Sequence, residues 1–233
     1  MTNNRHRLIV VCILSMSSTV ACHSPESAKT GEKNGSVSLN SPEIDVRRLP
    51  IEPGLSDPNC YLNGPVGVEA ELIERINDFR SAPRMCGVQR FEAAAPVSWN
   101  LRLLNAAYRH SVEMARSNLV SHTSLDSRQL WNRLDQVGYL YKTARENIAA
   151  GQPSVEKVML GWQRSPQHCA TLMASDVSEI GVACVYKQSS IYKYYWTMNV
   201  ARPMVVDRET MLEMEELKRA QEKSKYSSRS VVK

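Results

Sequence analysis

Apolar residues recur at helical spacing in two well-separated segments of the first half of the chain. In residues 68–80 they fall three or four positions apart, and Pro83 follows closely. This spacing lines one face of a helix, and proline ends a helix because it lacks a backbone N–H and clashes with the preceding turn. A longer segment with the same spacing follows Asn100 and reaches about Asn118. We therefore predict two amphipathic helices, the second with Asn100 as its N-cap.

Two further helices are predicted in the middle of the chain. Residues 127–137 have helical spacing, and Gly138 suits the left-handed conformation that ends many helices. Ser154 is a suitable N-cap for the other helix, whose apolar residues extend to Trp162 before Pro166 stops it.

The last third of the chain alternates between apolar and other residues, which indicates strands. Residues 180–186 place every second side chain on one face, and residues 192–200 form a second strand rich in aromatic side chains. Residues 187–191 are expected to form a hairpin turn between them, and a shorter strand is expected at 141–148. Helices early and a hairpin late favour an α+β fold over a doubly wound sheet.

The N-terminus has the layout of an export signal. Two arginines precede an apolar run over residues 8–14, and small residues lead up to Cys22. A small residue before a cysteine also resembles the lipobox of bacterial lipoproteins, whose cysteine becomes an acylated N-terminus. We expect residues 1–21 to be removed and Cys22 to anchor the chain to a membrane of the cell envelope; the alternative is an ordinary signal peptide. His23 stands where inner-membrane lipoproteins often carry Asp, which favours the outer membrane.

Composition divides the rest of the chain into three parts. Residues 22–58 are rich in Ser, Pro, Gly and charge without apolar periodicity, which is typical of a flexible linker. Residues 59–206 hold the predicted elements and form one domain, and residues 207–233 form a charged tail that is expected to be helical or disordered. The formal charge of +5 becomes +3 without the two arginines of the signal (5 − 2), which is too weak a bias to indicate a nucleic-acid partner.

The cysteine count predicts two disulfides. Of the six cysteines, Cys12 leaves with the signal and Cys22 takes the lipid. An even number in an exported chain indicates disulfides, and four cysteines allow three pairings. These four show no C-x-x-C spacing, so a structural zinc site is not expected. They are Cys60, Cys86, Cys169 and Cys184.

Several short motifs, taken in order, resemble the bacterial branch of the CAP superfamily, which includes cysteine-rich secretory and pathogenesis-related proteins. The resemblance covers about residues 72–203 and implies a three-layer α-β-α sandwich, with an antiparallel sheet between helices. The motifs are Ser121-His122-Thr123-Ser124, Glu146-Asn147-Ile148-Ala149-Ala150-Gly151, Gly161-Trp162, Ser165-Pro166-Gln167-His168-Cys169, Ile180-Gly181-Val182 and Tyr194-Tyr195-Trp196-Thr197.

The resemblance also implies a central groove. In the family it is lined by two histidines and two acidic residues, and in several members it binds a divalent cation. Here His122 matches the first histidine and Glu146 the first glutamate, whereas Ser165 and Tyr195 stand at the positions of the second glutamate and second histidine. His168 is typical of the bacterial branch and completes a reduced site.

One departure from the family pattern concerns the position before the glutamate. Arg145 stands where the family usually has glycine, so we expect a cation beside Glu146 that would compete with a metal for its carboxylate. His122 then has two interpretations. It is a metal ligand or general base, or it is a buried histidine that ties its loop to Glu146 by a hydrogen bond.

The resemblance further implies the disulfide pairing. Bacterial relatives carry cysteines at the positions of Cys86 and Cys169, which suggests that these two pair. Cys60 would then bridge to Cys184.

Three functions remain open from the sequence. The first is a binding module in the envelope that takes a lipid, cell-wall or protein ligand in the groove. The second is a metal-dependent hydrolase; a catalytic zinc needs three protein ligands, and only His122 and Glu146 are well supported here. The third is an adhesive lipoprotein that binds through residues 207–233. His110 is expected to pack in the core and Glu113 to lie on a solvated helix face.

Overall fold

The computed structural model describes residues 51, 53–56, 59–60 and 67–205, and positions 207, 209–210, 212–213, 216–217 and 219–220. The predicted signal peptide, Cys22, most of the predicted linker and the end of the tail lie outside these residues. The chain divides into two compact units, residues 1–35 and 36–233, and every described residue belongs to the second. Within the described part, no helix is both long and apolar enough to cross a membrane.

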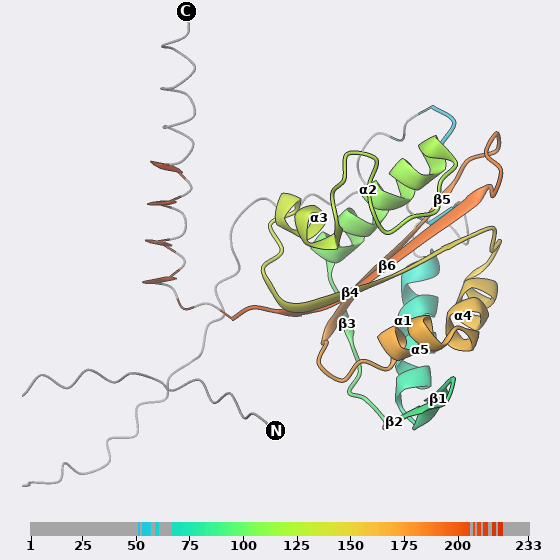
Figure 1. Ribbon diagram of the computed structural model, residues 1–233, viewed down its shortest axis with the longest axis horizontal. Coiled ribbons are helices and arrows are strands. Elements are labelled where there is room, and N and C mark those ends of the chain that lie inside the picture. Colours follow the sequence, from blue (N-terminus) through green and yellow to red (C-terminus); the bar gives the residue numbers. More distant parts are fainter. Residues whose placement is uncertain are drawn as a thin grey trace, which may run out of the picture. The chain divides into compact units, whose positions relative to one another are not determined.

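A four-stranded sheet forms the middle layer of this unit (Figure 1). Its order is β3-β5-β6-β4, so β4 lies at one edge. The strands are β3 (Ser98–Trp99), β4 (Tyr141–Ala150), β5 (Glu179–Tyr186) and β6 (Tyr194–Pro203). The pairs β4–β6 and β5–β6 are antiparallel as expected, but β3 pairs with β5 in parallel. The sheet is therefore mixed, because a two-residue strand that the sequence did not reveal joins its other edge.

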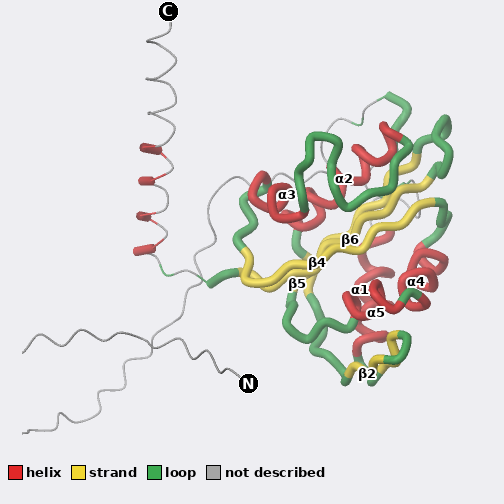
Figure 2. The backbone as a smooth tube through the Cα atoms, viewed as in Figure 1, coloured by secondary structure: helices red, strands yellow, loops and turns green. Residues whose placement is uncertain are grey.

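Helices cover both faces of the sheet (Figures 1 and 2). On one face lie α2 (Leu101–Ser117) and α3 (Leu130–Gln136). On the other lie α1 (Gly67–Arg80), α4 (Val155–Arg164) and α5 (Pro166–Leu172). This is the predicted three-layer α-β-α sandwich. Both faces of β5 and β6 are consequently buried, which explains why their burial does not alternate.

The predicted helix starts agree with the structure where a capping side chain was identified. The Asn100 side chain accepts two backbone N–H groups of the first turn of α2, and Ser154 accepts one from α4. The exception is α3, which begins three residues later than predicted because Ser127 has a φ of 68° and leaves the helical region. Gly138 follows this helix with a φ of 66°, as expected of a residue that ends one.

Besides β3, three short elements were not predicted. Pro166 does not simply stop a helix, because it is the first residue of α5. A small hairpin of β1 (Arg84–Cys86) and β2 (Gln89–Phe91) follows α1. Most residues of these two strands are exposed or half-buried, so the sequence has no alternation of apolar and polar residues there that would indicate strands.

Both implied disulfides are formed. Cys60 pairs with Cys184 and joins the start of the domain to β5, whereas Cys86 pairs with Cys169 and joins β1 to α5. They close sequence separations of 124 and 83 residues, each of which would stabilise the fold by about 4–5 kcal/mol in the chain-entropy model.

The structure also describes a few residues before and after the predicted domain. Leu55 and Ser56, inside the predicted linker, are buried, and the Ser56 N–H donates to the Tyr186 carbonyl oxygen at 3.0 Å. Proline and glycine on either side gave this segment the composition of a flexible linker, so its packing was not predicted from the sequence. In the tail, the described positions from 209 to 220 are helical.

Candidate functional site

The candidate site is built on the edge strand β4. Successive side chains of a strand point to opposite faces, so Glu146 and Asn147 serve different layers. Glu146 faces α2 and α3, where it contacts Arg133, and Asn147 faces α5, where its Nδ2 donates to the His168 carbonyl oxygen at 3.0 Å. The Glu-Asn pair thus ties residues of both helical layers to one strand.

The Glu146 carboxylate is buried and fully engaged. Its side chain is 4% exposed, with Oε1 2.8 Å from His122 Nδ1 and Oε2 2.7 Å from Arg133 Nη2. Asn199 lies opposite Glu146 on β6, and its amide nitrogen, when turned toward the carboxylate, donates to Oε2 at 3.3 Å. A buried carboxylate needs such partners, because an isolated charge in the interior is costly.

Arg133 supplies the cation that the sequence led us to expect from Arg145. Its side chain is 2% exposed on α3, and Nη1 and Nη2 both donate to the His122 carbonyl oxygen at 3.1 Å. Arg133 therefore holds the backbone of His122 and also the carboxylate that receives the His122 side chain.

The expected role of Arg145 is wrong, and strand alternation gives the reason. Arg145 points away from Glu146, its neighbour on β4, and binds Asp176 with both guanidinium nitrogens, at 2.5 and 3.0 Å. The Arg145 guanidinium is the first cause that holds the pKa of Asp176 below its usual value. Arg145 thus anchors the loop after α5 and does not compete for Glu146.

His122 is held at one end and open at the other. Its side chain is 54% exposed, so the interpretation as a buried histidine is wrong, although the hydrogen bond to Glu146 is present. In the neutral ring, the carboxylate that faces Nδ1 favours the tautomer with its proton on Nδ1, and Nε2 is then a hydrogen-bond acceptor. No described residue hydrogen-bonds Nε2.

His168 approaches the same place from α5. It is half-buried, and its pKa is lowered first by burial and then by the charge of His122. The two histidines are therefore within electrostatic range of each other, although they come from opposite layers. Ser165 is the N-cap of α5, one helical turn before His168, and it is half-buried.

Tyr195 does not line a groove with His122. It is wholly buried among apolar side chains of the α2 face, including Val112 and Ile148. On β6 it lies four residues before Asn199, the partner of Glu146, which is about 14 Å along a strand. The tyrosine at this position fills the core instead.

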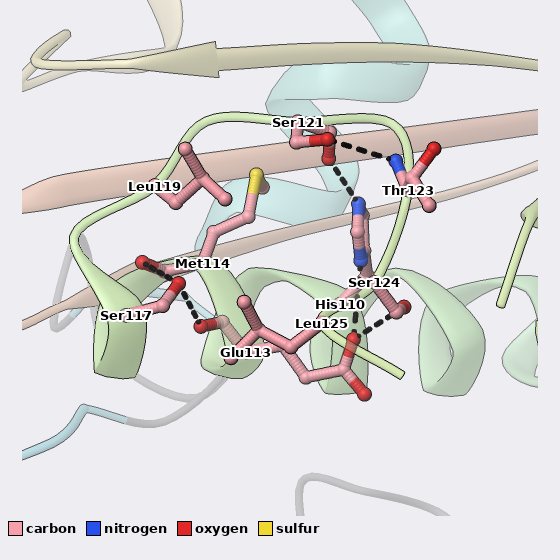
Figure 3. Close-up of a pocket in the computed structure, with 9 residues that line it drawn as sticks. All are labelled: His110, Glu113, Met114, Ser117, Leu119, Ser121, Thr123, Ser124 and Leu125. Atoms are coloured by element: carbon pink, nitrogen blue, oxygen red, sulfur yellow. Dashed lines mark hydrogen bonds and ion pairs between the residues drawn. The ribbon is translucent and has the colours of Figure 1, made fainter. Parts of the chain in front are cut away.

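A second polar network supports the His122 loop from below (Figure 3). His110 is 1% exposed, with Nε2 2.8 Å from the Ser121 carbonyl oxygen and Nδ1 3.4 Å from Glu113. Ser124 Oγ donates to Glu113 at 2.6 Å, and Arg128 also binds Glu113. These groups surround a cavity of about 10 Å³, enough for about one water.

This network changes two expectations. Glu113 is not on a solvated face; burial alone would raise the pKa of Glu113, but hydrogen bonds from Ser124 and Arg128 outweigh it and lower the pKa. His110 is buried as expected, and burial is the main cause that lowers its pKa. Ser124 also accepts from Arg133 Nη1 at 3.2 Å, which links this network to Glu146 and leaves Ser124 Oγ buried.

The residues of the site do not fit a catalytic zinc centre. Among the residues that the structure describes, no group of three or more His, Cys, Asp or Glu side chains could hold a metal ion. Both oxygens of Glu146 already have partners, one of them the buried Arg133 guanidinium. A cation placed on this carboxylate would have to displace His122 and would lie beside a positive charge.

The chain matches known proteins over this domain. Residues 73–200 match the model of the CAP group, described as the cysteine-rich secretory protein family. Two relatives come from Bacillus subtilis strain 168. "Uncharacterized membrane protein YlbC" is 29% identical over 105 residues, covering 45% of this chain and 28% of the relative. "Uncharacterized protein YkwD" is 31% identical over 90 residues, covering 39% and 35%. The chain thus spans about a third of the length of these relatives.

Two solved structures are similar to this one. An outer surface protein from Borrelia burgdorferi has a TM-score of 0.48 and 15% identity, over 59% of this chain and 90% of that chain. An extracellular protein with a SCP domain from Bacillus anthracis has a TM-score of 0.44 and 23% identity, over 59% and 42%.

Proposed function

Because the chain belongs to the cysteine-rich secretory protein (CAP) family, we propose that it is a binding module of the cell envelope whose ligand contacts His122. The observation that carries this proposal is the contrast between the two ends of that imidazole. Nδ1 is fixed by a buried carboxylate, and the ring is nevertheless 54% exposed. A histidine held this firmly while facing solvent is prepared to meet a ligand.

The chemistry of the exposed nitrogen restricts the ligand. Nε2 of neutral His122 accepts a hydrogen bond, so the ligand should offer a hydroxyl or amide N–H donor. His168, whose pKa is lowered, is a second neutral imidazole nearby. Cell-wall fragments are rich in both donor types, and we favour them over lipids and protein partners as the ligand class.

Hydrolysis is not favoured as the function of this site. Ser124 Oγ is committed to Glu113 and is buried, so it does not lie ready as a nucleophile for His122. The Glu146 carboxylate lacks a free oxygen for a metal ion. The pair of His122 and Glu146 resembles a base and its orienting carboxylate, but two groups alone make a poor catalyst.

The envelope location rests on the N-terminal sequence and on one relative. Cys22 with its preceding small residues supports acylation and a lipid anchor, and His23 in place of Asp favours the outer membrane. The Bacillus subtilis relative with 29% identity is named a membrane protein. Metabolic labelling with a fatty acid would test the anchor: Cys22→Ser should abolish incorporation.

Calorimetry with soluble muropeptides tests the binding proposal. We expect the full chain to bind, and His122→Ala and His168→Ala to weaken binding by about tenfold each, the loss of one hydrogen bond in a desolvated site. Gln167→Ala is the matched control, because this exposed neighbour of His168 lies on the same helix. Equal affinity of the parent and the three variants, or no binding at all, would show that His122 and His168 do not form a site for cell-wall fragments.

Zinc is titrated in the same experiment. The engaged Glu146 carboxylate predicts at most weak binding by the two imidazoles. Tight zinc binding that His122→Ala abolishes would instead support a metal site and the function of a metal-dependent hydrolase.

A further inference from the structure

Exposed apolar side chains gather at one end of the domain. Ile191 and Tyr192, in the loop between β5 and β6, are 77% and 43% exposed. Leu119 and Leu125, in the loop after α2, are 48% and 73% exposed. We call these four residues the apolar tip.

The two loops of the apolar tip are in contact. The Ile191 N–H donates to Asn118 Oδ1 at 3.1 Å, next to Leu119. Leu119 and Leu125 line the same small cavity (Figure 3). The hairpin loop and the end of α2 lie at the same end of the sandwich (Figure 1). The tip is therefore one surface.

Basic residues lie beside the hairpin loop of the apolar tip, whereas the exposed Asp126 follows Leu125 on its other side. Lys187 and Lys193 flank its hairpin loop, and Arg116 lies in the last turn of α2. Lys187 Nζ donates to the Ala115 carbonyl oxygen at 3.2 Å, which fixes the lysine beside the helix end. Residues 186–194 contain no acidic side chain. Exposed apolar groups with cations beside them are complementary to an anionic lipid surface.

Tyrosines add to this character. Tyr192 packs edge-on against Tyr195 with ring centroids 5.9 Å apart, which holds it in place in the loop. Tyr186 and Tyr194 stack at the base of the same hairpin, at 4.9 Å. Tyrosine prefers the boundary between water and lipid, because its ring is apolar and its hydroxyl is polar.

The chain enters the domain at this same end. Ser56 pairs with Tyr186 at the end of β5, through its N–H at 3.0 Å and through Oγ, which accepts the Tyr186 N–H at 2.8 Å. Cys22 lies 34 positions before Ser56 (56 − 22). A lipid at Cys22 would therefore be joined, through 34 positions of chain, to the segment that packs at this end of the domain.

We infer that the apolar tip docks on an anionic lipid surface, with Ile191 and Leu119 inserted between headgroups and the flanking lysines against them. This inference rests on the envelope location of the proposed function. Docking would place the domain on the membrane by a contact separate from the lipid of Cys22, and the loop of Leu119 and Leu125 that makes this contact also carries His122.

Sedimentation with vesicles tests the docking. The full chain with Cys22→Ser, which removes the acylation site, is mixed with vesicles of phosphatidylcholine alone or with phosphatidylglycerol. Leu119→Ser/Ile191→Ser is compared with Met85→Ser/Val88→Ser, a matched control because the β1–β2 hairpin also exposes two apolar residues, by 59% and 99%. We expect partitioning to phosphatidylglycerol vesicles to fall about tenfold for the tip variant and to change little for the control.

A second measurement locates the contact. Amide hydrogen exchange of residues 187–193 should slow on phosphatidylglycerol vesicles, whereas exchange of residues 84–91 should stay the same. Near-ultraviolet circular dichroism shows that each variant is folded.

The inference is overturned if the tip variant binds vesicles like the parent, if the control loses as much, or if phosphatidylcholine vesicles bind equally well. It is also overturned if analytical ultracentrifugation shows that the parent is a dimer and the tip variant a monomer, because the apolar tip would then bind a second copy of the chain and not a lipid surface. One combination of results separates the two proposals. If the chain with Cys22 incorporates a fatty acid but the Cys22→Ser chain does not bind vesicles, the proposed anchor is supported and the tip contact is refuted.

Discussion

Two buried arginines, Arg80 and Arg133, show how the same residue serves the fold in one place and a site in another. They are 1% and 2% exposed. Arg80 ends α1 and donates to backbone carbonyl oxygens of Ala95, Leu172 and Ala174. Arg133 also donates to backbone carbonyls, but one of its nitrogens binds the Glu146 carboxylate, whose other oxygen holds His122.

The difference lies in where each network ends. The Arg80 network closes within the interior and joins α1 to the segment after α5, close to the Cys86–Cys169 disulfide. The Arg133 network ends at a solvent-facing imidazole. A buried arginine is therefore structural by default, and a functional role is indicated when its partners lead to an exposed reactive group.

The largest expected effect is on the Arg133 side. Arg133→Met would leave the Glu146 carboxylate buried without its cation and should destabilise the domain by about 3–5 kcal/mol. Urea unfolding followed by circular dichroism measures this loss. Adding Glu146→Gln should recover part of it, because the unpaired charge is gone. A double variant as unstable as the two single losses combined would mean that the pair is not coupled.

Arg80→Met should cost less, about 2–3 kcal/mol, because it orphans neutral carbonyl groups and leaves no charge behind. The same unfolding experiment measures it. Ligand binding at His122 should be unaffected in the folded fraction. An effect on binding as large as that of Arg133→Met would show that the two networks are not independent.

Mild acid should act through the two histidines His110 and His168 and leave the Arg80 network unaffected. The pKa values of His110 and His168 are lowered in the fold, with burial the main cause. The unfolded chain therefore takes up these protons first, as pH falls through about 6.5, and the folded state loses stability there. Carboxylates with lowered pKa values, such as Asp176, cause loss only at lower pH, below about 4.

Two variants separate these contributions in urea unfolding between about pH 7 and pH 5, the window in which an unperturbed histidine titrates. His110→Gln should flatten the pH dependence, whereas Arg80→Met should keep the slope of the parent. A slope unchanged by His110→Gln would assign the acid sensitivity elsewhere.

The smallest effect on stability is expected at His122 itself. His122→Asn should change the free energy of unfolding by less than about 1 kcal/mol, since the side chain is half exposed and Glu146 keeps Arg133. Binding of muropeptides should nevertheless weaken by about tenfold, as for His122→Ala. A stable variant with intact binding would separate His122 from the proposed function.

The sequence predicted the layers of the fold better than the contacts of the site. The capping residue Asn100 and the strand pattern of residues 180–186 are local signals, and the structure has the helix and the strand that they predicted, although burial along β5 does not alternate. The two disulfides and the proximity of His122 to Glu146 followed from the family resemblance. Both kinds of signal can be read from the sequence itself, because they involve residues close together in the chain or complete motifs of the family.

The partner of Glu146 could not be predicted in this way. Arg145 is next to Glu146 in sequence but on the other face of the strand, and Arg133 reaches it from a short helix 13 residues earlier. On α3, no pattern distinguishes an arginine that points inward from one in solvent. Tyr195 likewise matched a family position whose side chain here is wholly buried.

The central claim is that buried Glu146 fixes His122 so that Nε2 faces the ligand as an acceptor. Long-range proton–nitrogen correlation NMR of the histidine rings tests this most directly, with His122→Asn assigning the resonance. We predict that neutral His122 carries its proton on Nδ1, and that Glu146→Gln relaxes this preference. A proton on Nε2, or a tautomer mixture equal in the parent and in Glu146→Gln, would contradict the account.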